Sequence, residues 1–485
     1  WVDSTDGAAV RVAMTVLSQS SGAGILLSLI DEEQLDDGSS RVDFRSRKGT
    51  IHADLTTGPS VSGTRALVAN QDLCLQGCKL VGDGFLLTSD ERDNLIAVDH
   101  RAEAFLPRYV AGRDLTQTEG VRYVVDFYGL DEAQARNEFA AGYQRLLHLV
   151  KPERDQNKRD TRRRNWWLFG ENAPKLRRAL KGLRRFIATS EVAKHRAFVF
   201  LPLPGTLADG SLAGIATDDA WHLGVLSSRV HVTWAFRRGG RMGAGNDPRY
   251  QNGPCFLLFP FPPSTPAQTA LIRSLGEALD AHRKRQQALH PGLTITGMYN
   301  VLEKLRSGEA LTAKEKVIHE QGLVSVLKQI HDDLDAAVFD AYGWPSTLTD
   351  EEILERLVAL NAERAEEERR GLVRWLRPEF QNPGGAKAAT QETLPGGDDE
   401  EEEPAAKPAA PLPWPKALPE RIAAVRDLMA RAPSPRSLAA VTSAFAKAKP
   451  KDVEPVLESL ASLGLLVSFD ASDGRHWQAA AAPRA

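Results

Sequence analysis

Short apolar runs rich in β-branched residues begin the chain. Three of them, at residues 10–17, 24–30 and 49–55, are separated by polar turns, and no long amphipathic pattern lies between them. Runs of this length and composition are typical of β-strands. We therefore predict that residues 1–70 form the closing edge of a sheet whose earlier strands lie outside the chain.

Residues 71–264 combine both periodicities, which predicts a mixed α+β domain. The pattern favours helices at 131–150 and 173–181, and a buried helix at 220–234. The segment 255–262 is apolar and bounded by prolines, which predicts a strand that ends the domain. Further strands are predicted at 84–87, 121–127, 197–201 and 212–216.

Residues 265–380 are expected to be almost purely helical. Thr265 has Pro266 after it and Gln268 three positions later, which is the pattern of a helix start with a capping box. Thr349 and Glu352 repeat that pattern before a second long helix.

The end of the chain divides into a linker and a small domain. Residues 381–413 are rich in Pro, Gly, Ala and acidic residues, so we expect a flexible linker. Residues 414–485 predict helices at 423–431, 437–446 and 452–463, followed by a hairpin over 464–474. Three helices and a hairpin indicate a winged-helix-like domain.

Composition limits the class of protein. A length of 485 residues is typical of about three domains, and 42% hydrophobic with 26% charged residues fits a soluble globular protein. We find no apolar run of transmembrane length and no signal peptide, since Asp3 and Asp6 stand at the start. Three cysteines favour a reducing compartment, so we expect a cytoplasmic location. Residue 1 is Trp, which indicates a fragment.

Charge is distributed unevenly despite a net charge of −3. Residues 151–185 are strongly basic, whereas 398–403 are wholly acidic. Cations interleaved with aromatic residues are typical of a surface that binds phosphates and grooves of DNA. The alternative is a solvated basic helix face with two core tryptophans. The candidate DNA contacts are Arg154, Lys158, Arg162, Arg163, Arg164, Asn165, Trp166, Lys194, His195 and Arg196.

A second basic cluster follows, in which glycines would let the backbone approach a ligand. Arginine and asparagine side chains beside them could read base edges, although an ordinary basic surface loop explains the pattern equally well. Its candidate DNA contacts are Arg237, Arg238, Arg241, Asn246, Arg249 and Tyr250.

Other chemistry is weakly indicated. Cys74 and Cys78 are spaced like half of a metal site, but no second Cys/His pair follows, so we expect no metal. His195 and His231 lie near basic residues, where a hydrogen-bonding or phosphate-facing role is commoner than general base catalysis.

Several motifs together resemble the MmeI-like DNA methyltransferases, which are adenine-N6 enzymes of restriction–modification and related phage-defence systems. The resemblance covers nearly the whole chain. It is carried by residues 7–16, 153–200, 221–228, 259–262, 297–300 and 341–344, including Asn165-Trp166-Trp167-Leu168-Phe169-Gly170-Glu171 and Lys194-His195-Arg196.

The resemblance implies a Rossmann-like methyltransferase domain, a target-recognition domain and a helical part. It also implies S-adenosylmethionine as cofactor and adenine flipped out of duplex DNA as substrate. The chain departs from the family by lacking the Gly-rich cofactor turn and the Asn/Asp-Pro-Pro-aromatic loop. Two near matches, at 81–85 and 247–250, we interpret as structural, since Arg249 stands where the loop requires proline.

We therefore predict no catalytic or cofactor-binding residues in this chain, and DNA target recognition as its function. The expected partners are double-stranded DNA, a missing N-terminal methyltransferase half and a possible protein partner for the C-terminal domain. The alternatives are a non-enzymatic DNA-binding adaptor in a defence complex and, less favoured, a nuclease.

Overall fold

The computed structural model comprises two compact units, Trp1–Thr393 and Leu394–Ala485. Among the residues that it describes, no helix is both long and apolar enough to cross a membrane. The strand predicted at 10–17 and most of the predicted linker at 381–413 lie outside the described residues. The described residues are 24–34, 40–52, 57, 59–117, 120–242, 247–384, 412–415, 418–430, 436–446, 448–462, 466–471 and 474–479.

A long antiparallel hairpin begins the described part of the first unit, with β1 at Gly24–Gln34 and β2 at Ser40–Gly49. The strand predicted at 24–30 is confirmed. Of the strand predicted at 49–55, Gly49 ends β2 and Ile51 forms an isolated bridge with Thr57, while residues 53–55 lie outside the described residues. The partner of β1 is instead a segment in which Val42 and Phe44 alternate with polar residues. Within the described residues β1 pairs with β2 alone, so its place at the edge of a methyltransferase sheet stays a prediction.

Two small four-stranded sheets form the middle of the first unit. One has the order β3-β10-β7-β8 and the other the order β4-β6-β5-β9. The strands are β3 Cys74–Gln76, β4 Leu86–Leu87, β5 Arg108–Val110, β6 Arg122–Val124, β7 Arg185–Ser190, β8 Val199–Pro202, β9 Thr206–Ala208 and β10 Leu212–Ile215. The strands predicted at 84–87, 121–127, 197–201 and 212–216 are therefore found in shorter or shifted form.

Two predicted helices are each broken in two. The helix expected at 131–150 divides into α3 Glu132–Glu138 and α4 Ala140–Leu149, because Phe139 between them leaves helical geometry. The Phe139 ring is buried 5.8 Å from that of Phe105. The helix expected at 220–234 divides into α8 Ala220–Ser227 and α9 Arg229–Arg238, where the Ser228 hydroxyl caps α9 by accepting from His231 N. Side chains that pack or cap thus override the continuous pattern.

The apolar segment 255–262 does not form the predicted strand. Residues Asn252–Leu257 form a π-helical turn, and Phe256 and Phe259 are fully buried. A short apolar run does not by itself distinguish a strand from a buried helical turn. This turn contacts α9 and β3, so the segment closes the core of the first sheet.

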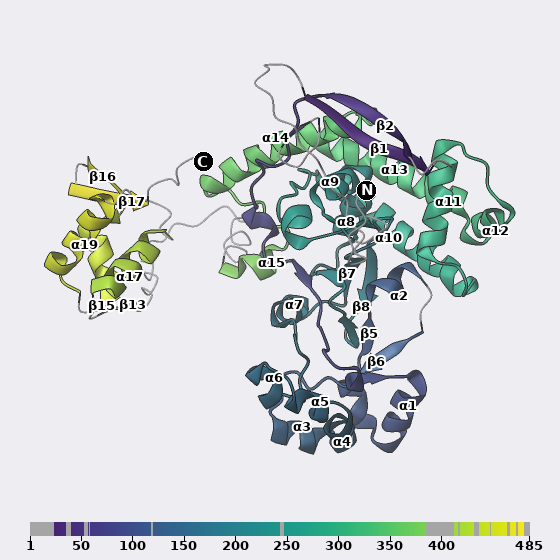
Figure 1. The fold of residues 1–485 in the computed structure, drawn as a ribbon, viewed down its shortest axis with the longest axis horizontal. Coiled ribbons are helices and arrows are strands. Elements are labelled where there is room, and N and C mark those ends of the chain that lie inside the picture. Colours follow the sequence, from purple (N-terminus) through teal and green to yellow (C-terminus); the bar gives the residue numbers. More distant parts are fainter. Residues whose placement is uncertain are drawn as a thin grey trace, which may run out of the picture. The chain divides into compact units, whose positions relative to one another are not determined.

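Residues 265–380 are mainly helical, as predicted, and their apolar side chains belong to the same core. The helices are α10 Pro266–Leu289, α11 Ile295–Ser307, α12 Ala313–Gly322, α13 Val324–Tyr342, α14 Asp350–Arg369 and the short α15 Pro378–Gln381. Both predicted capping boxes are present: Thr265 with Gln268, and Thr349 with Glu352. Figure 1 shows α11, α12, α13 and α14 at one end of the unit, and α1 Ser89–Val98 with α3 and α4 at the other.

The second unit contains three helices and a hairpin at the predicted places. Its helices are α17 Leu418–Ala430, α18 Leu438–Ser443 and α19 Pro450–Ser462, and its hairpin is β16 Leu466–Ala471 with β17 Gly474–Ala479. A further short strand, β14 at Arg436–Ser437, pairs with β17. The buried residues form one core that includes Val441, Leu457 and Trp477. Assignment to the winged-helix class stays a prediction.

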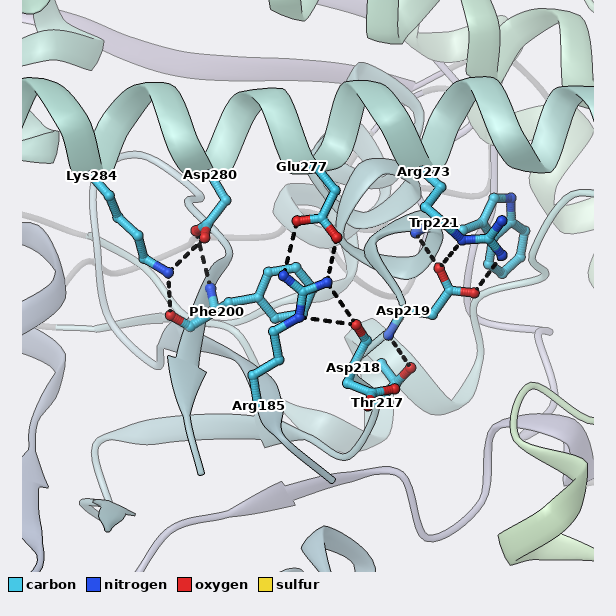
Figure 2. Close-up of polar contacts among 10 residues, drawn as sticks. All are labelled: Arg185, Phe200, Thr217, Asp218, Asp219, Trp221, Arg273, Glu277, Asp280 and Lys284. Carbon is cyan, nitrogen blue, oxygen red and sulfur yellow. Dashed lines mark hydrogen bonds and ion pairs between the residues drawn. The ribbon is translucent and has the colours of Figure 1, made fainter. Parts of the chain in front are cut away.

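Buried polar groups on α10 fasten the helices to the first sheet (Figure 2). Asp280, 5% exposed, accepts a hydrogen bond from the backbone N–H of Phe200 at 3.1 Å and from Lys284 Nζ at 2.6 Å. Arg283, 1% exposed, donates to the carbonyl of Phe198 at 2.6 Å. A buried polar group without its partner incurs its full desolvation cost, so this contact fixes how α10 lies on β8.

We predict that Asp280→Ala lowers the free energy of unfolding by about 3 kcal/mol, because the Phe200 N–H loses its acceptor and the buried guanidinium of Arg283 loses a carboxylate 3.8 Å away. Asp280→Asn keeps an acceptor oxygen and serves as the matched control, with a smaller loss. Urea unfolding followed by tryptophan fluorescence measures both. A loss below about 0.5 kcal/mol for the alanine variant would show that the contact contributes little.

Candidate nucleic-acid interface

The basic segment folds into three short helices before β7. Residues 151–185 carry thirteen Lys and Arg against four Asp and Glu. The helices are α5 Lys151–Asp155, α6 Asp160–Arg164 and α7 Pro174–Leu180. Isolated helices of this length are unstable in water, so side chains that reach the core must hold them. The cations consequently divide into an inner set, which anchors, and an outer set, which faces solvent.

Arg154 belongs to the inner set. Its side chain is 1% exposed, and its Nη2 donates to the carbonyls of Leu80 at 2.8 Å and Leu168 at 3.3 Å. The guanidinium lies 5.7 Å from the centre of the Phe85 ring, and burial lowers the pKa of Arg154. The prediction that Arg154 contacts DNA is therefore wrong for this structure, because its guanidinium faces the core and fixes α5.

The two tryptophans of the segment are core residues. Trp166 is 3% exposed with its ring 5.3 Å from that of Tyr143, and Trp167 Nε1 donates to the carbonyl of Leu130 at 3.1 Å. A buried ring has no free face on which a base could stack. The core alternative thus holds for Trp166, whereas neighbouring Asn165 is exposed.

Arg177 and Arg185 complete the inner set. Arg177 Nη1 lies 2.7 Å from Asp126, and its guanidinium covers the Tyr128 ring at 4.5 Å. Figure 2 shows Arg185 reaching from β7 to Glu277 of α10, with an Nη1–Oε2 distance of 2.9 Å, and also donating to the Asp218 carbonyl. Paired guanidinium groups of this kind are geometrically specific. The pair with Asp126 therefore fixes α7, and the pair with Glu277 fixes the start of β7.

The outer set lies on α6, on α7 and beside them. Figure 1 shows α6 and α7 on the same flank of the first unit. The side chains of Lys158, Arg159, Lys175 and Lys181 are exposed, and the structure gives them no ion-pair partner among the described residues. We call this surface the basic flank; its members are Lys158, Arg159, Arg163, Arg164, Lys175, Arg178, Lys181 and Arg184, which are exposed, and Arg162, which is half-buried.

Five members of the basic flank were not among the predicted contacts: Arg159, Lys175, Arg178, Lys181 and Arg184. The last four recur at every third position, which places Lys175, Arg178 and Lys181 near one helical face, and this spacing is the signal that could have found them. Exposed cations gathered on one flank produce a local positive potential in a chain of net charge −3.

Two residues of the predicted cluster 194–196, Lys194 and His195, contact α11. Lys194 Nζ lies 3.0 Å from Glu303, and His195 Nε2 lies 2.7 Å from Asn300 Oδ1. Arg196 is 5% exposed and donates to the carbonyls of Ser190 and of Pro248, and burial lowers its pKa to about 10. The prediction of DNA contact is therefore wrong for Arg196. Burial also lowers the pKa of His195.

Arginines at the end of α9 hold an earlier part of the chain. Arg237 Nη2 donates to the carbonyl of Pro59 at 3.4 Å, and Arg238 Nη1 to that of Val61 at 2.9 Å. Both are half-buried, whereas Arg241, in the short strand β11 Arg241–Met242, is exposed. DNA contact by these three residues stays a prediction.

The segment 247–250 is structural, as interpreted from its sequence. Arg249 lies 2.7 Å from Glu191, and Tyr250 is 1% exposed with its hydroxyl 3.1 Å from His231 Nε2. The prediction that Tyr250 contacts DNA is therefore wrong, because the ring is enclosed. Asn246 lies outside the described residues.

Neither the Cys74 and Cys78 pair nor the glycine turn at 81–85 forms an open ligand site in the structure. No group of three or more His, Cys, Asp or Glu among them is placed to hold a metal ion. Cys74 and Cys78 lie in different cores, and burial raises the pKa of Cys78 to about 11. The glycine turn at 81–85 is closed: a Cβ on Gly84 would lie 2.7 Å from side-chain atoms of Leu149 and Val150.

Comparison with known proteins identifies the region that carries the basic flank. Residues 60–263 match the family model described as "MmeI, target recognition domain". This segment, which is less than half of the chain, is therefore similar to a target recognition domain of the MmeI type. It contains both four-stranded sheets and the whole basic segment.

Two individual proteins are also similar to parts of the chain. A solved structure titled "Structure of Type IIL restriction-modification enzyme MmeI in complex with DNA has implications for engineering of new specificities" is 18% identical, with a TM-score of 0.51, over 67% of this chain and 40% of that chain. "DNA methyltransferase A" of Bacillus subtilis (strain 168) is 28% identical over 183 residues, which are 37% of this chain and 18% of the relative. The chain thus spans less than half of either relative.

Three buried histidines of the first unit are held neutral rather than poised for proton transfer. Burial lowers the pKa of His222 to about 4, and those of His231 and His331 to about 3, from an ordinary value of 6.5. In the unfolded chain each takes up a proton near pH 6.5. The unfolded state therefore binds more protons below that pH, and stability falls as the pH drops toward the folded pKa values.

We predict a loss on the order of 2 kcal/mol per buried histidine between pH 7.5 and pH 5. His222→Gln removes one titrating group, so the slope of unfolding free energy against pH between 6 and 5 decreases by about 1.4 kcal/mol per pH unit. His100→Gln, at an exposed histidine, is the control. Identical slopes for wild type and the His222 variant would contradict a neutral buried ring.

Proposed function

We propose that this chain recognises duplex DNA for an adenine-specific DNA methyltransferase of a restriction–modification or phage-defence system. The observation that carries the proposal is the basic flank on an MmeI-type target recognition domain. Its lysines and arginines are exposed, and the inner set fixes the backbone beneath them. Such a surface suits the phosphate backbone of DNA, which supplies most of the sequence-independent binding energy.

Base reading requires a different group of residues. We propose that Arg241, exposed just before residues 243–246, reads base edges while the basic flank holds phosphates. The complete enzyme would use S-adenosylmethionine, bound by a methyltransferase half that this chain does not supply. The second unit, with its winged-helix-like elements, would serve a protein partner.

We predict that Lys158→Ala with Arg159→Ala weakens binding of a 30-base-pair duplex about tenfold at 100 mM salt. The slope of log affinity against log salt should decrease by about two, because two phosphates are no longer neutralised by the protein. Fluorescence anisotropy across a salt series measures both quantities. The matched control is Lys314→Ala with Lys316→Ala, which removes the same charge from exposed positions on α12. An unchanged slope in the first variant would remove these residues from the interface.

Methyl transfer to adenine requires a cofactor-binding turn and a catalytic loop. The sequence contains no Asn/Asp-Pro-Pro-aromatic loop, and its glycine turn is filled by side chains. We therefore expect no transfer of radiolabelled methyl from S-adenosylmethionine to DNA by the purified chain. Transfer to adenine is expected once a methyltransferase half is supplied. Detectable transfer by the chain alone would contradict the proposed division of labour.

A further inference from the structure

One carboxylate stands inside the basic flank. Asp160, the first residue of α6, lies 2.9 Å from Arg163 Nη2 through Oδ1 and 2.7 Å from Arg164 Nη2 through Oδ2. The two carboxylate oxygens of Asp160 thus pair with the guanidinium groups of two successive arginines. A second donor of Arg163, Nη1, reaches the Asn157 carbonyl at 3.1 Å. The two arginines are therefore oriented by protein atoms before any ligand arrives.

The other acidic residues of the basic segment form no ion pair with the basic flank among the described residues. Asp155 pairs with Lys151 at 2.7 Å, and Glu171 pairs with Lys79 at 2.9 Å. Glu153 is exposed, and the described residues give it no ion pair with a member of the basic flank. Among the four acids at 151–185, Asp160 alone is placed on cations of the flank.

These ion pairs are open to solvent. Half of the Asp160 side chain is exposed, as are 43% of that of Arg163 and 77% of that of Arg164. Exposed pairs contribute little stability and weaken further with salt. A phosphate offers guanidinium groups the same kind of anionic oxygen acceptor and forms strong charge-assisted hydrogen bonds with them. Exchange of the carboxylate for a phosphate therefore requires only side-chain rotation.

We propose that Asp160 is an internal substitute for a DNA phosphate, which holds Arg163 and Arg164 in the free protein and yields them to the backbone of bound DNA. It is a positioning residue that also weakens non-specific binding, because each phosphate must displace it. The inference rests on the proposed function, since it presumes that the basic flank meets DNA.

The test compares charge-neutralising variants by anisotropy with a 30-base-pair duplex at 100 mM salt. Asp160→Asn should tighten binding about fivefold, since the arginines no longer have a competing carboxylate. Glu153→Gln removes the same charge from the same segment without releasing an arginine of the flank, and should change affinity less than twofold. Asp160→Glu restores a carboxylate and should bind like wild type.

A double-mutant cycle separates this mechanism from a general effect of charge. In a background of Arg163→Ala with Arg164→Ala, Asp160→Asn should change affinity less than twofold. The proposal is overturned if Asp160→Asn binds no more tightly than wild type, if Glu153→Gln tightens binding equally, or if the gain survives in the double-alanine background. Failure of the wild-type chain itself to bind duplex DNA would instead reject the proposed function.

Discussion

Contacts between inward-facing guanidinium groups and the core determine how the basic segment folds. Arg154, Arg177 and Arg185 turn inward and find carbonyls, carboxylates and aromatic faces. Removing such a partner leaves a charge without solvation, which costs several kcal/mol. The inward residues therefore hold α5, α7 and the start of β7, and the remaining cations are left on the surface as the basic flank.

The long helix α10 makes similar charged contacts with the sheet that precedes it in the sequence. Arg185 and Asp280 join β7 and β8 to α10 through charged hydrogen bonds, and Arg273 of α10 pairs with Asp219 at the start of α8 at 2.7 Å. Figure 2 shows these contacts along one side of α10. The long helix thereby supports the sheet from which the basic segment emerges, so the position of the basic flank depends on α10.

The starts of the long helices could be predicted from the sequence, because the two residues of a capping box lie only three positions apart. Thr265 and Thr349 begin helices where the sequence placed them. Phe139 and Ser228 break two others, and both breaks depend on tertiary packing or on a cap inside an apolar run. Such breaks are not visible in a periodicity that continues across them.

The division of the cations was harder to predict from the sequence, since charge alone does not say which way a side chain points. Arg154 was nevertheless marked: it follows Tyr143, Leu146 and Val150 on the apolar stripe of α4 and α5, all of them buried. An arginine on an apolar stripe is expected to turn into the core and to find a hydrogen-bond acceptor there, as Arg154 does at the Leu80 carbonyl. The burial of Trp166, in contrast, could not be predicted from its residue type, because tryptophan suits both stacking on a base and packing in a core.

In the proposed function, the basic flank is the surface that meets DNA. Hydrogen–deuterium exchange of the intact chain, with and without duplex DNA at low salt, tests this directly. The account predicts protection concentrated at residues 158–184, with α12 unchanged. Protection confined to α10–α14 or to the second unit, with none on α6 or α7, would contradict it.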